Sequence, residues 1–270
     1  FDVTEAVVTG WVAMDTDAVL TLLQETAEQV INPRFRALAD GEVMSKSRPD
    51  DLVTVADQEA EVIITAALRA AYPHAVILGE EASLGDATVI ADFRAADHAF
   101  TVDPVDGTRN FVNGSPDHAV MVSEMRDGQA VRAWIWQPQH RVAYVAERGA
   151  GLWRNGERVQ RDEPAQDPSQ WRARTSDRRR IGTMLGPVGP LELTWISCGI
   201  DYPKLAGGEC DLIVYAGTLP WDHMPGSLMI EEVGGALGDL DGRPYTPSRQ
   251  PRGIVAAATP GLLESVLAWL

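Results

Sequence analysis

The sequence of 270 residues predicts a protein of mixed α and β structure, built around sheets rather than as a helical bundle. Two amphipathic helical patterns come first, a series of apolar runs separated by hairpin turns follows, and strand and helix patterns alternate towards the C-terminus. Because 45% of the residues are hydrophobic, the chain can bury a substantial core, as one large domain or as two packed together.

The first two helices are predicted over residues 15–35 and 56–72, where apolar side chains recur at helical spacing. Two short strands are predicted next, "AVILG" at residues 75–79 and "AFTVD" at residues 99–103. We expect the second strand to end at Asp103 and to turn through Gly107 into a helix near Thr108. Acidic residues therefore follow the carboxyl end of each strand.

Residues 118–159 predict an antiparallel meander, because "DG", "QPQ", "RGAG" and "NG" separate successive apolar or alternating runs. The polar, proline-containing stretch that follows is the best candidate for a domain boundary. We expect an N-terminal α+β domain over residues 14–158 and a C-terminal α/β domain over residues 159–270. The later strands are predicted over 211–215, 234–242 and 252–258, and the later helices over 221–233 and 260–270.

Composition limits the partners of this chain. Asp and Glu number 39 against 23 Lys and Arg, and the net charge of -16 opposes general binding to nucleic acid or to an anionic membrane. There is no apolar stretch of membrane-spanning length, and the first residues lack a secretory signal pattern. We therefore expect a soluble, cytoplasmic protein.

One basic cluster departs from this acidic background. The segment "RARTSDRRR", residues 172–180, gathers five arginines and ends at Arg180. It can be a solvated loop, or it can contact a distal phosphate or another acidic group of a ligand. Both readings stay open, with Arg180 as the candidate contact.

The segment "DPVDGTRNF", residues 103–111, places two carboxylates and a glycine after an apolar strand. A turn through Gly107 into a helix would direct backbone N–H groups and the helix dipole at one point, which suits an anion such as phosphate. Asp103 and Asp106 would repel that anion unless cations lie between them and it. Carboxylate oxygens at strand ends suit Mg²⁺, which shares its coordination with water and substrate phosphate.

Further carboxylates come from distant segments. "GEE" places Glu80 and Glu81 after a strand, and "PWD" places Asp222 at the start of a helix. Each is ordinary alone, as a solvated turn or a helix N-cap. A centre with two metal ions about 3.5–4 Å apart, however, needs several carboxylates from different segments.

In the order "DDLVTVAD", "GEE", "DPVDGTRNF", "WDHMPG" and "EEVGG", residues 46–235 resemble the inositol monophosphatase family of magnesium-dependent, lithium-sensitive phosphatases. The resemblance implies a layered α-β-α-β-α sandwich of the inositol monophosphatase and fructose-1,6-bisphosphatase type. It also implies two or three Mg²⁺ ions per active site, with Mn²⁺ as a possible substitute. Because the family commonly forms dimers, a homodimer is expected.

The resemblance also implies roles for individual residues. Glu80, Asp103 and the carbonyl of Val105 would hold the first metal, and Asp103, Asp106 and Asp222 the second. Asp57 and Thr108 would orient and deprotonate the attacking water, and the amides of Gly107 and Thr108 would hold phosphate oxygens. Asp106 would also contact the substrate. Three further candidates are less specific. Glu81 would contact a third ion through water, and Lys46 would lie near the active site. His223 would approach the substrate or support a metal ligand.

The implied reaction is direct attack of metal-activated hydroxide on phosphorus, which releases orthophosphate and an alcohol without a phosphoenzyme. The substrate class is less defined, because Tyr215 stands where inositol-specific relatives have an acidic residue that contacts ring hydroxyls. A sugar bisphosphate, histidinol phosphate and 3'-phosphoadenosine 5'-phosphate are alternatives within the superfamily. A regulatory, protein-binding role is the alternative of another class.

Overall fold

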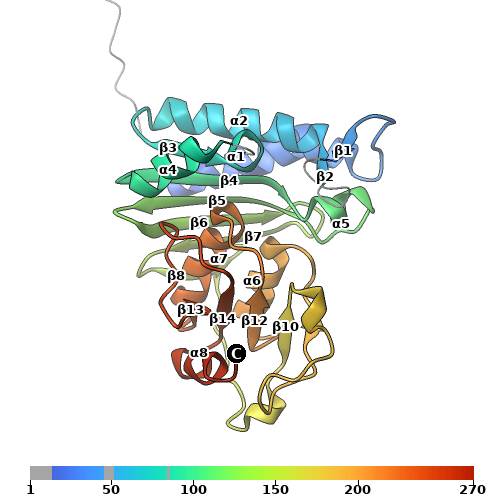
Figure 1. Ribbon diagram of the computed structural model, residues 1–270. Helices are drawn as coiled ribbons and strands as arrows, with labels where there is room; N and C mark the ends of the chain where they lie inside the picture. The colour runs from blue at the N-terminus through green and yellow to red at the C-terminus, as the bar shows by residue number, and fades with distance from the viewer. Residues whose placement is uncertain (1–13, 46–51, 84–85) are drawn as a thin grey trace, which may run out of the picture.

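The computed structural model describes residues 14–45, 52–83 and 86–270. Figure 1 shows five layers: helices α1 (Thr16–Thr26) and α2 (Val55–Ala71), a large sheet, helices α6 (Cys198–Ala206) and α7 (Pro220–Glu232), a smaller sheet, and helix α8 (Pro260–Leu267). This arrangement confirms the predicted α-β-α-β-α sandwich. The described part of the chain has a buried apolar cluster on each face of each sheet, with the central cluster shared between the two sheets through α6 and α7.

The larger sheet carries the predicted meander. Its strands follow one another in space in the order of the sequence, and all neighbours are antiparallel except the first pair, which is parallel. The strands are β3 (Val76–Gly79), β4 (His98–Asp106), β5 (Ala119–Arg126), β6 (Gln129–Gln137), β7 (Val142–Glu147), β8 (Gly151–Arg154) and β9 (Glu157–Arg158).

Two long helical segments cover the outer face of this sheet, close to the predicted positions. Helix α1 (Thr16–Thr26) continues through a π-helical turn, η1 (Ala27–Ile31), and a 3₁₀ turn, η2 (Asn32–Arg34). Helix α2 (Val55–Ala71) begins with a capping box in which Thr54 and Asp57 satisfy each other's backbone N–H groups. A small antiparallel ribbon, β1 (Val43–Ser45) and β2 (Leu52–Thr54), lies beside the start of α2.

The strand predicted to end at Asp103 is longer than expected. Strand β4 continues to Asp106, because Asp106 pairs with Ala119 of β5 after an irregularity in the register between Asp103 and Asp106. The irregularity bends the end of the strand, as β-bulges do. Gly107 then adopts a positive φ of 80° and helix α5 (Thr108–Val112) begins at Thr108, as predicted.

The smaller sheet is mixed. Its spatial order is β11 (Glu192–Leu193), β10 (Ala173–Thr175), β12 (Leu212–Tyr215), β14 (Ile254–Ala257) and β13 (Ala236–Asp239). Strand β10 is parallel to both of its neighbours, whereas β14 is antiparallel to both of its own. The carboxyl ends of β10 and β12 therefore point the same way.

The helices of the second half bury this sheet on both faces. They are α6 (Cys198–Ala206) and α7 (Pro220–Glu232) on the inner face and α8 (Pro260–Leu267) on the outer face. All residues of α7 from Met224 to Ile230 are buried, as expected for a helix between two sheets. Because α7 packs against both sheets, the division at residue 159 into two domains stays a prediction.

Several short elements were not predicted. They are α3 (Glu80–Ser83), α4 (Ala87–Ala95), the 3₁₀ turns η3 (Pro168–Gln170) and η4 (Arg178–Arg180), and the strands β1, β2, β10 and β11. Glu80 and Glu81 therefore start a short helix, where a turn was the ordinary expectation for an acidic pair after a strand.

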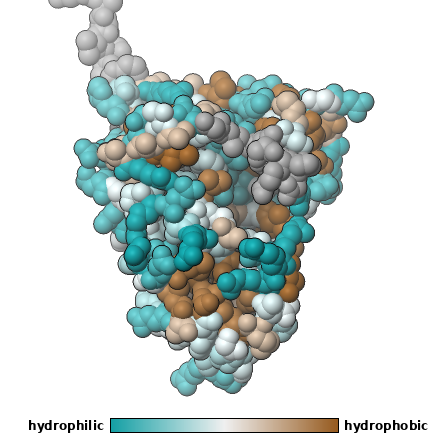
Figure 2. All heavy atoms as spheres, viewed as in Figure 1, coloured by the Kyte–Doolittle hydropathy of each residue, from teal (hydrophilic) through white to brown (hydrophobic). Residues whose placement is uncertain are grey.

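Hydrophilic atoms are spread over most of the face in Figure 2, and hydrophobic atoms gather mainly in its lower half, at the level of the smaller sheet. Among the described residues, no helix has the length and apolar character needed to cross a membrane.

Candidate active site

Three aspartates from two distant segments converge between the sheets. Asp103 and Asp106 lie at the carboxyl end of β4, and Asp222 lies in the first turn of α7, after Pro220 and Trp221. One carboxylate oxygen from each lies within 4.8 Å of the others, and no other group of His, Cys, Asp or Glu in the described residues meets this criterion. The fold thus brings together the acidic residues of "DPVD" and "PWD".

This cluster is electrostatically unfavourable without a cation. Burial raises the pKa of Asp103 well above its usual range, and the carboxylates of Glu80, Asp106 and Asp222 raise it further. Asp103 is 1% exposed, and its buried Oδ1 has no hydrogen-bond partner among the described residues. A buried, unpaired carboxylate oxygen surrounded by like charges is costly, and a bound divalent cation removes that cost.

Asp106 is held by the start of helix α6. Its Oδ1 accepts a hydrogen bond from the backbone N–H of Cys198 at 3.1 Å, and its Oδ2 accepts one from Gly199 at 2.8 Å and another from the Ser197 hydroxyl. Burial raises the pKa of Asp106, whereas these hydrogen bonds lower it. A methyl group on Gly199 would lie 3.2 Å from Asp106 Oδ2 and 2.4 Å from the Ala119 side chain, so this approach requires glycine.

Glu80 is positioned beside Asp103 through a contact that the sequence pattern did not reveal, whereas Glu81 does not belong to the group of three aspartates. Glu61, buried on α2, accepts hydrogen bonds from the backbone N–H groups of Glu81 at 2.7 Å and Ala82 at 2.8 Å. These bonds fix the first turn of α3, and a Cβ at Gly79 would lie 2.4 Å from the Glu61 carboxyl carbon. Glu61 and Gly79 therefore set the position of Glu80, whose carboxylate interacts with Asp103.

The predicted pair of Asp57 and Thr108 is in contact. The Thr108 hydroxyl lies 3.1 Å from Asp57 Oδ1 and 3.0 Å from the carbonyl oxygen of Val105. The backbone N–H of Thr54 donates to Asp57 Oδ2 at 2.9 Å, so the capping box of α2 also orients this carboxylate. Gly107, immediately before Thr108, lies so close to Ser197 that a Cβ there would be 2.9 Å from the Ser197 Cβ.

A cavity of about 420 Å³ opens beside the aspartates. Asp106 and Asp222 form part of one wall, and Arg178, Tyr215 and His223 are among the other lining residues. This volume lies within the range of about 300–1,000 Å³ that is usual for small-molecule sites. Asp103 is buried behind the cavity rather than among the residues that line it.

The predicted substrate contacts are distributed unevenly around this cavity. Tyr215 lines it, but the tyrosine is 3% exposed and its hydroxyl is buried, without a hydrogen-bond partner among the described residues. His223 is buried, and its Nδ1 lies 2.8 Å from the Tyr202 hydroxyl. Burial lowers the pKa of His223 to about 3.

In the arginine cluster, Arg178 lines the cavity, whereas the predicted contact Arg180 does not. Lys46 lies outside the described residues.

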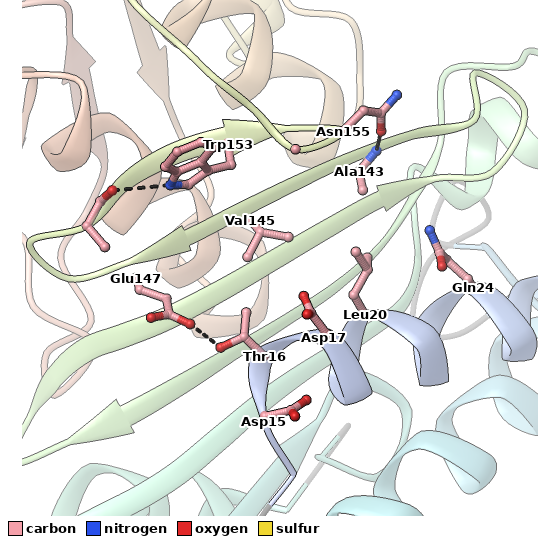
Figure 3. Close-up of a pocket in the computed structure, with 12 residues that line it drawn as sticks. Asp15, Thr16, Asp17, Leu20, Gln24, Ala143, Val145, Glu147, Trp153 and Asn155 are labelled. Carbon is pink, nitrogen blue, oxygen red and sulfur yellow. Dashed lines mark hydrogen bonds between the residues drawn. The ribbon is translucent and has the colours of Figure 1, made fainter.

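A second and larger cavity, of about 590 Å³, shares no lining residue with the first and lies between the start of α1 and the strands β7 and β8 (Figure 3). Asp15, Asp17 and Glu147 border it, together with Leu20 and Trp153. The Thr16 hydroxyl donates a hydrogen bond to Glu147, and no group of these carboxylates meets the criterion for a metal cluster.

The residues around Asp103 fit a divalent metal. They supply hard oxygen donors, one of them buried and unpartnered, at the edge of a cavity open to a small ligand. A hydroxyl and a carboxylate suited to proton transfer, Thr108 and Asp57, lie beside them. This arrangement can support metal-assisted hydrolysis of a phosphate ester.

Comparison with known proteins agrees with this chemistry. The chain is 29% identical over 235 residues to the Nus factor SuhB of Pseudomonas aeruginosa, covering 77% of this chain and 80% of the relative. It is 25% identical over 248 residues to an inositol-1-monophosphatase of Bacillus subtilis, covering 88% and 89%. A solved structure titled as an IMPase/NADP phosphatase complexed with Mg²⁺ and phosphate has the same fold, with a TM-score of 0.78, 20% identity and coverage of 94% and 95%. The family model described as the inositol monophosphatase family matches residues 14–269, and the chain therefore belongs to that family.

Proposed function

We propose that this protein is a Mg²⁺-dependent phosphatase that hydrolyses small-molecule phosphate monoesters. The observation that carries the proposal is the convergence of Asp103, Asp106 and Asp222 beside a cavity of about 420 Å³. Membership of the inositol monophosphatase family supports the same reaction.

In this proposal the metal ions are held by Glu80, Asp103, the Val105 carbonyl, Asp106 and Asp222. When bound, Mg²⁺ supplies Lewis-acid stabilisation of the charge on the phosphoryl and leaving oxygens. The chain itself fixes the donors: α6 holds Asp106 through its first amides, and Glu61 holds the turn that carries Glu80.

The proton of the attacking water passes to Thr108 and Asp57. The Thr108 hydroxyl can take a proton from the water as it gives its own to Asp57 Oδ1, 3.1 Å away. The Thr54 N–H donates a hydrogen bond to the other carboxylate oxygen of Asp57, Oδ2. This bond holds the Asp57 side chain in the rotamer that faces Thr108. The amides of Gly107 and Thr108 hold phosphate oxygens, and Asp106 touches the substrate as well as the metal.

The organic part of the substrate occupies the cavity. Inositol phosphates are one candidate class, supported by the name of the Bacillus subtilis relative. The buried Tyr215 offers no accessible acidic group for ring hydroxyls, so sugar bisphosphates, histidinol phosphate and 3'-phosphoadenosine 5'-phosphate remain in the proposal as alternatives. A regulatory role in a protein complex is supported only by the name of the SuhB relative.

The test is phosphate release by the purified chain of 270 residues. Inositol 1-phosphate, fructose 1,6-bisphosphate, histidinol phosphate and 3'-phosphoadenosine 5'-phosphate are each supplied with Mg²⁺, Mn²⁺ or EDTA. We expect release from at least one ester with Mg²⁺ and none with EDTA. No release from any ester by folded protein saturated with Mg²⁺ would overturn the proposal. Size-exclusion chromatography of the same sample tests the expected homodimer.

A further inference from the structure

Arg178 is a cation without a partner at the edge of the cavity beside the aspartates. Its side chain is exposed and lines the cavity, and it makes no hydrogen bond or ion pair with any described residue. The adjacent Arg179 behaves differently, because it forms an ion pair with Asp177 at 2.9 Å and does not line the cavity. A chain with a net charge of -16 thus leaves one arginine unpaired where a ligand would enter.

The backbone holds Arg178 at this place. It begins the 3₁₀ turn η4, three residues after β10 ends at Thr175, and Asp177 caps that turn by accepting a hydrogen bond from the Arg179 N–H at 3.0 Å. The neighbouring parallel strand β12 ends at Tyr215, and the Ala216 N–H donates to the Ser176 hydroxyl at 3.0 Å, which ties the two strand ends together. Ligands of α/β sheets commonly bind beyond the carboxyl ends of parallel strands.

Among the residues that the structure describes, Arg178 is also the only Lys or Arg that lines the cavity. The acidic residues there are Asp106, Asp201 and Asp222, and Asp201 is occupied by a hydrogen bond from the Trp195 N–H at 2.8 Å. The wall with Asp106 and Asp222, where metal ions are proposed to bind, is one place for a negatively charged group of a ligand. The guanidinium of Arg178 is a second, separate place. Arginine binds phosphate in a bidentate manner, which fixes orientation as well as affinity.

We propose that Arg178 binds a second phosphate group of the substrate, so that the protein acts preferentially on phosphate esters that carry a second phosphate on the same small molecule. The inference rests on the proposed phosphatase function and narrows its substrate class. One phosphate lies at the aspartate cluster and is cleaved, and the other lies at Arg178 and is kept. An ester with a cationic organic part, such as histidinol phosphate, is disfavoured.

The experiment compares matched esters that differ only in the second phosphate. The pairs are fructose 1,6-bisphosphate with fructose 1-phosphate, and 3'-phosphoadenosine 5'-phosphate with 3'-AMP. With Mg²⁺ saturating, we expect the wild type to favour the bisphosphate of at least one pair by about tenfold or more in kcat/KM, equivalent to about 1.4 kcal/mol. Arg178→Gln should reduce this preference to about twofold or less while leaving kcat/KM for the other ester of the pair unchanged within about twofold.

Two further variants separate the role of Arg178 from general effects on the turn. Arg178→Lys should keep part of the preference, because it keeps the charge but not the bidentate geometry. Arg179→Gln is the matched control and should keep the wild-type preference. A wild type without preference for either bisphosphate, or an Arg178→Gln variant with the wild-type ratio, would overturn the inference.

Failure of the proposed function gives a different result. If no ester in either pair is hydrolysed, and inositol 1-phosphate and histidinol phosphate are not hydrolysed either, the phosphatase proposal fails, and the same pairs are then compared by calorimetric titration in Mg²⁺. Tighter binding of a bisphosphate that Arg178→Gln abolishes would still support the second phosphate site. Equal binding of both members of each pair would refute it.

Discussion

The carboxylates beside the two cavities described above differ, and only the group of Asp103, Asp106 and Asp222 is built like a metal centre. Asp15, Asp17 and Glu147 border the larger cavity in Figure 3, with Asp15 and Asp17 exposed to solvent. Their oxygens are used locally: Asp15 caps α1 by accepting from the Ala18 N–H at 2.7 Å. Asp103 and Asp106 are instead 1% and 6% exposed.

The difference between these groups lies in burial and convergence rather than in the number of acids or the size of the cavity. The side chains of Asp15 and Asp17 stay in contact with water, which solvates a carboxylate at little cost in free energy. The buried ones repel one another, and Asp103 keeps an oxygen with no partner among the described residues. Folding thus assembles an unfavourable group of like charges at one place, which is the expected signature of a site completed by a cation.

The largest expected effect comes from removing the central carboxylate. Asp103→Asn should lower kcat/KM for phosphate release by at least about 10³-fold, or about 4 kcal/mol, because the proposed bridging ligand is lost. Asp17→Asn, in the exposed group, should stay within about twofold of the wild type. Steady-state phosphate release with Mg²⁺ measures both variants, and circular dichroism checks that they fold. If a folded Asp103→Asn protein turned over substrate at the wild-type rate, the buried carboxylates would be no more important for activity than the exposed ones.

A smaller loss is expected at the proton-transfer pair. Thr108→Val should lower kcat by about 10²-fold, which is within the usual contribution of a positioned acid or base. Thr108→Ser keeps the hydroxyl that contacts Asp57 and should retain most of the activity. The measurement is kcat at saturating substrate and Mg²⁺. If valine and serine variants were equally active, the hydroxyl would have no part in the reaction.

The two groups should also differ in how they affect stability as pH changes. The pKa values of Asp103 and Asp106 are raised in the folded protein, so between the ordinary value near 3.9 and the raised values the folded state binds more protons than the unfolded state. The free energy of unfolding of the metal-free protein should therefore fall as pH rises through this window, by up to about 1.4 kcal/mol per pH unit for each such group.

Denaturant titrations in EDTA from pH 5 to pH 8 measure this slope. Asp103→Asn should reduce it, since one proton-binding group of the folded state is gone, and Asp17→Asn should leave it unchanged. Adding Mg²⁺ at pH 8 should raise the stability of the wild type more than that of Asp103→Asn. Identical slopes for the wild type and Asp103→Asn would contradict the assignment.

The smallest expected effect tests the contact between Asp106 and helix α6. Ser197→Ala removes one donor to Asp106 but leaves the amides of Cys198 and Gly199 in place. We expect about a fivefold rise in the Mg²⁺ concentration needed for half-maximal activity, close to 1 kcal/mol for one hydrogen bond. Ser265→Ala, on the exposed side of α8, is the control. An unchanged Mg²⁺ titration would show that the backbone amides suffice.

Much of this arrangement could be predicted from local patterns. Helical spacing predicted the segments that became α1 and α2, and turn residues predicted the meander from β5 to β9. The motif "DPVDGT" identified the start of α5 at Thr108, although strand β4 ends three residues later than predicted. These patterns are local because helices and hairpins are determined by neighbouring residues. The metal-ligand roles of the residues that converge there stay predictions until tested.

The remaining features depend on contacts between distant segments. Nothing near Glu61 in the sequence shows that it holds the amides of Glu81 and Ala82, 20 and 21 residues away. The extension of β4 to Asp106 needed its partner Ala119, and the position of Arg178 rather than Arg180 in the cavity depends on the turn that follows β10. Short helices such as α3 lack the length at which periodicity becomes informative.

The hydrogen bonds from the start of helix α6 to Asp106 have a consequence for protein synthesis. The amides of Cys198 and Gly199 and the carboxylate of Asp222 all follow Asp106 by more than 90 positions in the sequence. A nascent chain that has already completed the larger sheet therefore carries Asp103 and Asp106 without the groups that complete their surroundings. Under the proposed function, such a chain should stay inactive on the ribosome until helix α7, which carries Asp222, has emerged.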